Sequence, residues 1–168
     1  KNGDDSLGIA FDFCKKLNKH LGVTLMISHC EDEIVLEPQN FKITKGNINR
    51  AQGYFSQFQL EINNFSEALP SSKSNMTFGD FFKSVDTECD IIIDLSENTP
   101  MFIGDHKRDG YFRASTNSPN DLLEIFAKAI DMIGEFEKPI YVNYNDSLCA
   151  HSRNEKTGCS KCLDVCPA

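Results

Sequence analysis

Four cysteines are concentrated near the C-terminal end of the sequence. They all lie within eighteen positions: Cys149, Cys159, Cys162 and Cys166. Core packing does not explain this density, because a buried free cysteine behaves as a small apolar residue and has no reason to cluster. Thiols spaced this closely on a polar segment can converge on one centre. These four cysteines are therefore the strongest structural constraint in the sequence, and they act on residues 139–168.

The last three of these cysteines have the spacing C-x2-C-x3-C-P, which ends at Pro167. This is the second half of the bacterial run that binds a 4Fe–4S cluster. In two-cluster ferredoxins the cysteine before the proline ligates the other cluster, so Cys166 is a ligand of either this cluster or a second one. Nine polar or small residues separate Cys149 from Cys159. Because such a loop can fold back, Cys149 remains a candidate fourth ligand.

Zinc is the alternative metal for the same cysteines. Structural zinc sites usually pair two knuckles of the C-x2-C type. Only one such knuckle is present, between Cys159 and Cys162. Iron–sulfur binding is therefore favoured, while a structural zinc ion and a metal-free tail stay open.

Charge and hydropathy exclude several classes of partner. The 168 residues carry a net charge of −8 and contain no block of lysines or arginines. Nucleic acid and anionic membranes are therefore not expected as partners, because both attract positive surfaces. No apolar run approaches the roughly 20 residues that a membrane span needs. A partner protein with a positively charged patch remains open.

The other three cysteines indicate the compartment. Cys14, Cys30 and Cys89 are scattered among apolar residues. Together with the four clustered cysteines they make an odd total of seven, which does not fit a disulfide framework. We therefore expect a reducing compartment, the cytoplasm.

The first third of the chain predicts a helix followed by a strand. Apolar residues recur with the helical period over residues 6–21, and residues 23–27 form a short apolar, partly β-branched run. A helix that leads through Gly22 into a buried strand is half of a βαβ unit, so we expect its first strand before Lys1. Gly3 and Gly8 are only a fragment of the glycine-rich fingerprint of dinucleotide sites, and they predict such a site weakly.

Antiparallel strands are predicted next. Residues 34–36, 41–44 and 57–62 read as short half-buried strands, and the second of them is expected to end before Gly46. Residues 69–74 are predicted to form a solvated turn, with an anion-binding loop as the less favoured alternative.

The run from Asp90 to Leu95 contains three consecutive isoleucines. Such a run predicts a strand buried on both faces, as in the middle of a parallel sheet. Ligands usually bind at the carboxyl ends of such strands, which makes Asp94 and Glu97 candidate acids. We favour the alternative that both are solvated or capping carboxylates. The mixed-charge stretch 105–113, which includes Arg108 and Arg113, is predicted to be a structural loop, with a docking patch as the alternative.

The strongest helix signal lies at residues 118–133. Ser118 is a suitable N-cap, Pro119 suits the first turn, and Gly134 is the expected stop. Residues 140–144 alternate as a strand that leads to the cysteines. The predicted fold is α/β: a partial Rossmann-like sheet with helices and an antiparallel β section over residues 1–138. A short ferredoxin-like cysteine segment follows over residues 139–168.

Several motifs resemble a bacterial protein group. The stretch C-A-H-S-R-N from Cys149 and the stretch G-C-S-K-C-L-D-V-C-P from Gly158 are similar to ferredoxin-type 4Fe–4S cluster-binding proteins with an N-terminal α/β domain. Body motifs of that group recur as L-P-S-S at Leu69, C-D-I-I-I-D-L-S at Cys89, T-P-M-F at Thr99 and R-D-G-Y-F-R-A at Arg108. The resemblance implies an electron carrier or redox subunit that works with a redox partner protein, rather than a stand-alone enzyme.

A small-ligand binding module is the competing function. In that case the α/β body would hold a nucleotide-like ligand and the cysteine tail would be structural. Hydrolytic or transfer chemistry has little support, because G-x-S-x-G, P-loop and H-E-x-x-H motifs are absent. The sequence starts at Lys1 and stops at Ala168, one residue after the Cys-Pro pair. We therefore expect it to be a piece of a longer protein, and we expect this piece to bind its cluster weakly or not at all.

Overall fold

The structure, a computed structural model of the chain, describes residues 3–28, 34–35, 39–69, 75–102 and 108–134. By its internal contacts the chain divides into two units, Lys1–Ile133 and Gly134–Ala168. All elements described below belong to the first unit. The predicted strand 140–144 and the four clustered cysteines lie outside the described residues.

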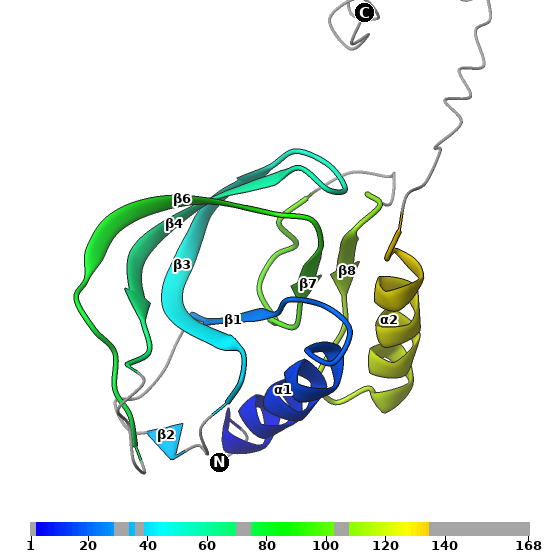
Figure 1. Cartoon of the computed structure of the whole chain (residues 1–168), viewed down its shortest axis with the longest axis horizontal. Coiled ribbons are helices and arrows are strands. Elements are labelled where there is room, and N and C mark those ends of the chain that lie inside the picture. Colours follow the sequence, from blue (N-terminus) through cyan, green and yellow to red (C-terminus); the bar gives the residue numbers. More distant parts are fainter. Residues whose placement is uncertain (1–2, 29–33, 36–38, 70–74, 103–107, 135–168) are drawn as a thin grey trace, which may run out of the picture. The chain divides into compact units, whose positions relative to one another are not determined.

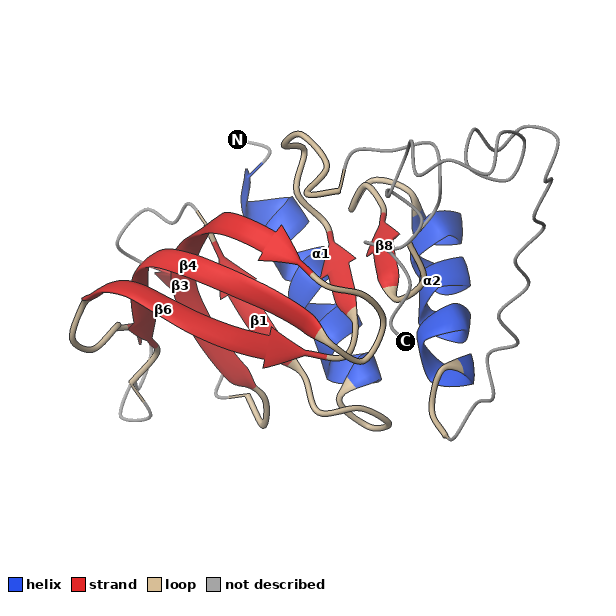
Figure 2. Cartoon of the chain, turned by 90° about the horizontal axis from the view of Figure 1, so that it is seen from above, coloured by secondary structure: helices blue, strands red, loops and turns tan. Residues whose placement is uncertain are grey.

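The main sheet has four strands in the order β1-β3-β4-β6 (Figure 1). Their bounds are Thr24–Ile27 for β1, Lys42–Gln52 for β3, Phe58–Glu67 for β4 and Phe82–Cys89 for β6. Strand β1 pairs with β3 in parallel, and the two remaining pairs are antiparallel. Figure 2 shows β6 as the outer strand of this sheet. The antiparallel section predicted from the sequence is therefore the larger part of the sheet.

Strand β3 is longer than its sequence predicts. It continues through Gly46, where we expected it to end, and the pairing with β4 shifts register between Lys45 and Asn47. A Cβ atom at Gly46 would lie 2.6 Å from Cγ2 of Ile62. The glycine therefore marks a bulge with close strand contact and not a turn.

Two further strand pairs are short. Strands β2 (Ile34–Val35) and β5 (Asn75–Met76) pair antiparallel, whereas β7 (Ile92–Asp94) and β8 (Tyr111–Arg113) pair in parallel. The isoleucine run therefore forms a parallel strand as predicted, but in a two-stranded sheet and not in the middle of a larger one. Strand β8 lies in the stretch that we predicted to be a loop.

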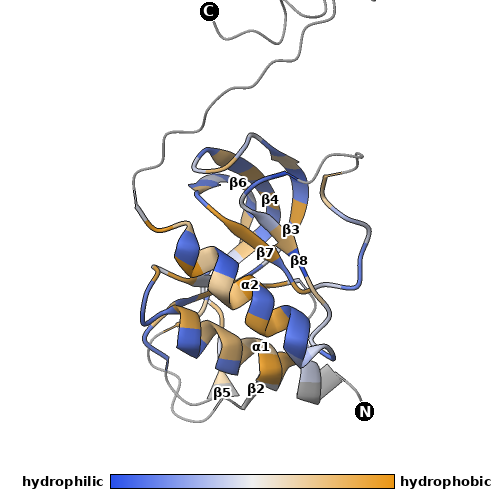
Figure 3. Cartoon of the chain, turned by 90° about the vertical axis from the view of Figure 1, so that its right-hand side faces the viewer, coloured by the Kyte–Doolittle hydropathy of each residue, from blue (hydrophilic) through white to orange (hydrophobic). Residues whose placement is uncertain are grey.

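Both predicted helices are present: the first begins three residues before the start and ends four residues before the end of the predicted stretch 6–21, and the second lies within the predicted stretch 118–133. Helix α1 spans Gly3–Leu17 and helix α2 spans Pro119–Asp131. Ser118 occupies the N-cap of α2 with an extended backbone, although its side chain makes no capping hydrogen bond. Met132 is the C-cap of this helix, and Gly134 follows with a φ of +132°. The figures show α1 and α2 side by side, and both carry apolar and polar residues in alternation along their length (Figure 3).

Helix α1 contributes to two apolar cores. Its residues Phe11 and Cys14 pack in the first core with Ile27 of β1, Phe41, Ile43 of β3 and Met76 of β5. Its residues Phe13 and Leu17 pack in the second core with Ala114 and three residues of α2, namely Leu122, Ile125 and Ala129. Ile93 of β7 packs against this second core, which explains why β7 is apolar without strands on both sides.

The fold is thus mixed α/β, with a four-stranded sheet, two short strand pairs and two helices among the described residues. This confirms the coarse fold class predicted from the sequence. Within the described residues, neither helix is long and apolar enough to cross a membrane.

Candidate functional site

The predicted cluster ligands Cys149, Cys159, Cys162 and Cys166 lie outside the described residues, and so does Cys30. Two cysteines are described, and both are free thiols. Burial raises the pKa of Cys14 from 9.0 to about 11. Burial, assisted by the neighbouring Asp90 carboxylate, raises the pKa of Cys89 to about 11 as well. Both are therefore neutral thiols at pH 7. Metal ligation requires thiolates, so neither is a favourable metal ligand.

No group of three or more His, Cys, Asp or Glu residues in the described part of the chain could hold a metal ion. The candidate acids predicted from the sequence were Asp94 and Glu97. The structure does not bring them together as a pair, because Asp94 is buried and Glu97 is exposed. The chemistry at this position therefore depends on Asp94 alone.

Asp94 lies at the carboxyl end of β7, directly beside Arg113 at the carboxyl end of β8. Its carboxylate is only 2% exposed. Oδ1 accepts hydrogen bonds from the Ser96 hydroxyl at 2.6 Å and from the Ser96 backbone N–H at 2.9 Å. Oδ2 accepts a hydrogen bond from the Tyr111 hydroxyl at 2.9 Å and lies 3.7 Å from Nε of Arg113. Both oxygens are therefore occupied by partners within the protein.

Tyr111 connects Asp94 to the loop that follows β7. Its hydroxyl accepts a hydrogen bond from the Met101 N–H at 3.2 Å while it donates to Asp94. Burial, with a smaller contribution from Asp94, raises the pKa of Tyr111 above its ordinary value. The phenol therefore stays protonated at neutral pH and keeps its role as donor.

The arginines of the mixed-charge stretch are used to hold loops. Arg113 donates to the carbonyls of Ser96 and Asn98. The guanidinium of Arg108 lies 4.4 Å from the centre of the Phe102 ring and donates to the carbonyl of Gly53. Both arginines thus support the structural interpretation of this stretch over the docking patch. Asp105, His106 and Lys107 lie outside the described residues.

The Asp94 cluster is therefore built to fix the loop after β7, as the capping alternative predicted. A general base needs a free lone pair directed at a substrate. Here Oδ1 accepts from Ser96 of the loop after β7 and Oδ2 accepts from Tyr111 of β8, and the described residues contain no buried side-chain polar atom without a partner. The observed geometry favours a structural role.

The structure also shows the position of Gly8, one of the two glycines that weakly predicted a dinucleotide site. Gly8 lies inside helix α1, and a Cβ atom there would meet nothing within 4 Å. A phosphate-binding glycine is needed where backbone must approach a ligand closely or adopt an unusual φ. Neither condition holds at Gly8, so this residue gives no support to nucleotide binding.

Sequence reasoning missed a polar surface on the main sheet. Two neighbouring open depressions, of about 500 and 680 Å³, share Gln52, Gln59 and Glu88 in their linings. The larger is also lined by Arg50, Glu61 and Asp86. The alternation of β4 places Phe58, Leu60 and Ile62 on one face and leaves Gln59 and Glu61 on the other, and this was the available signal. Strand β6 gave none, because its residues are mostly polar and exposed.

No protein-family model matches the chain, and the searches of curated proteins and of solved structures give no significant match.

Proposed function

We propose that this chain is an iron–sulfur electron-transfer protein, with a ferredoxin-like 4Fe–4S segment over residues 139–168. The single observation that carries the proposal is the spacing C-x2-C-x3-C-P at Cys159, Cys162 and Cys166, preceded by Cys149. Four closely spaced thiols suit such a cluster, because each iron takes one thiolate from the protein. When bound, the cluster would supply a one-electron redox centre.

The protein's own residues would hold and tune this centre. Cys159 and Cys162 would ligate from one tight turn, and Cys166 would ligate the same or a second cluster. Cys149 would reach the centre through the polar insert 150–158. Arg153 and Lys156 in that insert carry positive charge, which favours the thiolate form of nearby cysteines and would raise the reduction potential.

The described body supports this assignment by leaving no competing thiols. Cys14 is buried in the first core, and Cys89 is at the end of β6, with a pKa of about 11 for each. Because burial raises their pKa above that of an exposed cysteine, these thiols compete less well for iron than exposed thiols do. Free thiols in the body also fit a reducing compartment, and we propose the cytoplasm on that basis.

The body would carry the redox segment and provide the surface on which a partner protein docks. In this proposal residues 1–138 form a partial Rossmann-like body without an active site of its own, and a redox partner protein docks on its charged surface. The fully partnered carboxylate of Asp94 fits such a role, because it stabilises a loop and leaves no free base for catalysis.

Anaerobic purification of the full chain tests the proposal. After reconstitution with iron and sulfide we expect brown protein with iron and acid-labile sulfide in equal amounts, and visible absorbance that bleaches on reduction with dithionite. Zinc in place of iron would support the structural-zinc alternative. Colourless protein that takes up no iron after reconstitution with iron and sulfide would refute the assignment.

Single cysteine substitutions identify the ligands. Cys159→Ser and Cys162→Ser should lose most of the iron and the visible absorbance, because each removes a thiolate ligand. Cys89→Ser is the matched control and should keep both, since Cys89 is a neutral thiol of the body. Cys149→Ser decides whether the stretched first spacing contributes a ligand.

A further inference from the structure

Strand β6 forms an open edge of the main sheet. It is the last strand in the order β1-β3-β4-β6 and pairs only with β4. Among the described residues, no backbone hydrogen bond joins β6 to an element other than β4. Its eight residues span roughly 26 Å at the usual rise of a strand. An open edge of this length presents a row of unpaired N–H and C=O groups that an extended peptide can use.

Side chains on the outer face of the sheet form rows that run across the strands. The register pairs Gln52 with Gln59 and Gln59 with Glu88, and these three residues form the first row. Nε2 of Gln52 donates to Oε1 of Gln59 at 2.8 Å, and Nε2 of Gln59 donates to Oε1 of Glu88 at 3.3 Å. In both hydrogen bonds the donor lies on the strand farther from the β6 edge and the acceptor lies on the strand nearer to that edge. The row therefore ends on β6 in a carboxylate that can still accept hydrogen bonds.

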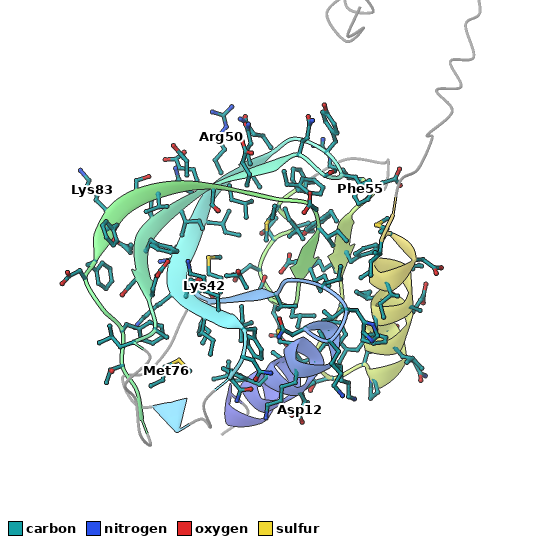
Figure 4. All side chains as sticks on the ribbon, viewed as in Figure 1. Asp12, Lys42, Arg50, Phe55, Met76 and Lys83 are labelled. Carbon is teal, nitrogen blue, oxygen red and sulfur yellow. The ribbon has the colours of Figure 1, made fainter. Side chains whose placement is uncertain are left out.

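The second row carries charge and ends in the same way. The register pairs Arg50 with Glu61 and Glu61 with Asp86. Figure 4 shows Arg50 on the side of the sheet away from helix α1, so this row faces solvent. Glu61 has one cationic neighbour in the row and one anionic neighbour. The structure records no hydrogen bond or ion pair for Asp86 among the described residues, so a cation placed beyond Asp86 would relieve the repulsion between the two carboxylates.

A third row is aromatic. Phe65 pairs with Phe82 across the two strands, and their ring centres are 6.4 Å apart. Phe82 is 53% exposed and Phe81 is 63% exposed. At this end of the edge an added strand would gain by placing an apolar side chain beside Phe82.

The rows define what should pair with β6. We propose that β6 binds an extended, basic segment of a partner protein, which adds to the sheet as a fifth, antiparallel strand. Opposite Glu88 and Asp86 the segment carries Lys or Arg, two positions apart, and opposite Phe82 it carries an apolar residue. Its pattern is therefore basic-x-basic-x-x-x-apolar. The inference does not depend on the cluster, because it uses only residues of the α/β body.

A second copy of this chain is a poor occupant of the same edge. Antiparallel pairing of two identical edges requires a twofold axis perpendicular to the sheet, which keeps the outer faces on the same side. The acidic ends of the rows in both copies would then share one face, with like charges close together. Charge complementarity therefore favours a basic segment over self-pairing.

A fluorescein-labelled heptapeptide, Lys-Thr-Lys-Val-Thr-Val-Phe with blocked termini, tests the proposal on the full chain. In the proposed register its lysines lie opposite Glu88 and Asp86, and its phenylalanine lies opposite Phe82. Fluorescence anisotropy should give saturable binding that weakens as salt rises from 0.05 to 0.5 M. A peptide with Glu in place of both lysines should not bind. Equal binding of the two peptides would overturn the proposal.

Backbone methylation separates strand addition from simple charge attraction. In a paired strand only alternate residues direct their N–H groups at the neighbour. One peptide N-methylated at its odd positions and one methylated at its even positions keep the same charges. One of them should lose binding and the other should keep it. Equal binding of both would show that no strand is added.

Variants of the protein locate the site. The Asp86→Asn/Glu88→Gln double variant should weaken binding by roughly tenfold, as expected for the loss of two exposed charge pairs. Asp12→Asn/Asp131→Asn removes the same net charge from exposed helix positions and should bind like the unmodified chain. Equal weakening in both double variants would overturn the assignment to β6. Concentration-dependent dimerisation that the peptide does not reverse would instead assign the edge to a second copy, and would also overturn it.

Discussion

The hydroxyl of Tyr111 donates to Oδ2 of Asp94 at 2.9 Å and thereby joins the first residue of β8 to the last residue of β7. Because the two strands are parallel, their backbone pairing alone places Tyr111 opposite Ile92 and not opposite Asp94. The side-chain bond therefore adds a diagonal connection between the two strands. The Tyr111 hydroxyl also accepts a hydrogen bond from the Met101 N–H, which ties in the loop that follows β7.

Tyr111→Phe should destabilise the protein by about 1–3 kcal/mol, because it leaves Oδ2 of a buried carboxylate with one partner fewer. The Met101 N–H loses its acceptor in the same variant. Urea unfolding followed by circular dichroism measures the change. Tyr54→Phe is the matched control and should be neutral, since Tyr54 is 62% exposed. Equal stability of both variants would show that the bond is energetically unimportant.

Gly110→Ala should destabilise the protein by about 2 kcal/mol or more. Gly110 has a φ of +79°, and a Cβ atom there would lie 2.8 Å from Cδ2 of Phe55 and 3.0 Å from Cε2 of Phe58. Backbone strain and overpacking therefore act together. Gly8→Ala should have the opposite sign, a gain of about 0.5–1 kcal/mol, because Gly8 lies in a helix with free space around it. Thermal unfolding of the two variants checks both signs.

The thiol of Cys14 should make stability depend on pH above neutrality. Its pKa is about 11 in the folded protein and 9.0 when unperturbed, so between these values the unfolded chain has lost the proton that the folded chain retains. Stability from this group is therefore complete below pH 9 and is lost as pH rises toward 11, by on the order of 2 kcal/mol. Urea unfolding of Cys14→Ala should show a smaller loss than the unmodified chain over this range. Parallel curves would contradict the assignment.

Arg108→Gln should cost about 1 kcal/mol through loss of the stacking on Phe102 and of the charge on the donor to Gly53. Both partners are near the surface, so the effect is modest. Lys19→Gln serves as the control, because Lys19 is an exposed cation just after the end of helix α1, far in sequence from Arg108. Thermal unfolding at low ionic strength compares the two.

The sequence predicts those elements whose apolar residues recur with a regular period. Helix α2 was placed within two residues at each end, because its stripe from Leu122 to Ala129 faces the second core. Strand β6 was not predicted, since six of its eight residues are exposed and no apolar alternation results. The extent of β3 was misjudged because a glycine that indicates a turn in isolation lies here at a bulge.

The candidate site was also only partly predictable, because its residues come from segments without a clear apolar pattern. The loop-capping alternative for Asp94 could be stated from its position after an apolar strand, but its partners Tyr111 and Arg113 come from a stretch without a clear strand pattern. The rows on the outer face depend on the register between three strands, which the sequence does not determine. The proposed cysteine ligands could be named from the sequence alone, because their spacing is local and does not depend on how strands pair.

Helix α1 is the only described element with buried residues in both apolar cores. A movement that takes α1 out of one core therefore also disturbs its packing in the other core. Local opening of the α2 side and of the β1 side should therefore be thermodynamically linked. In native-state hydrogen exchange, the slowest amides of β3 and of α2 are expected to share one opening free energy, so that the body unfolds as a single cooperative unit.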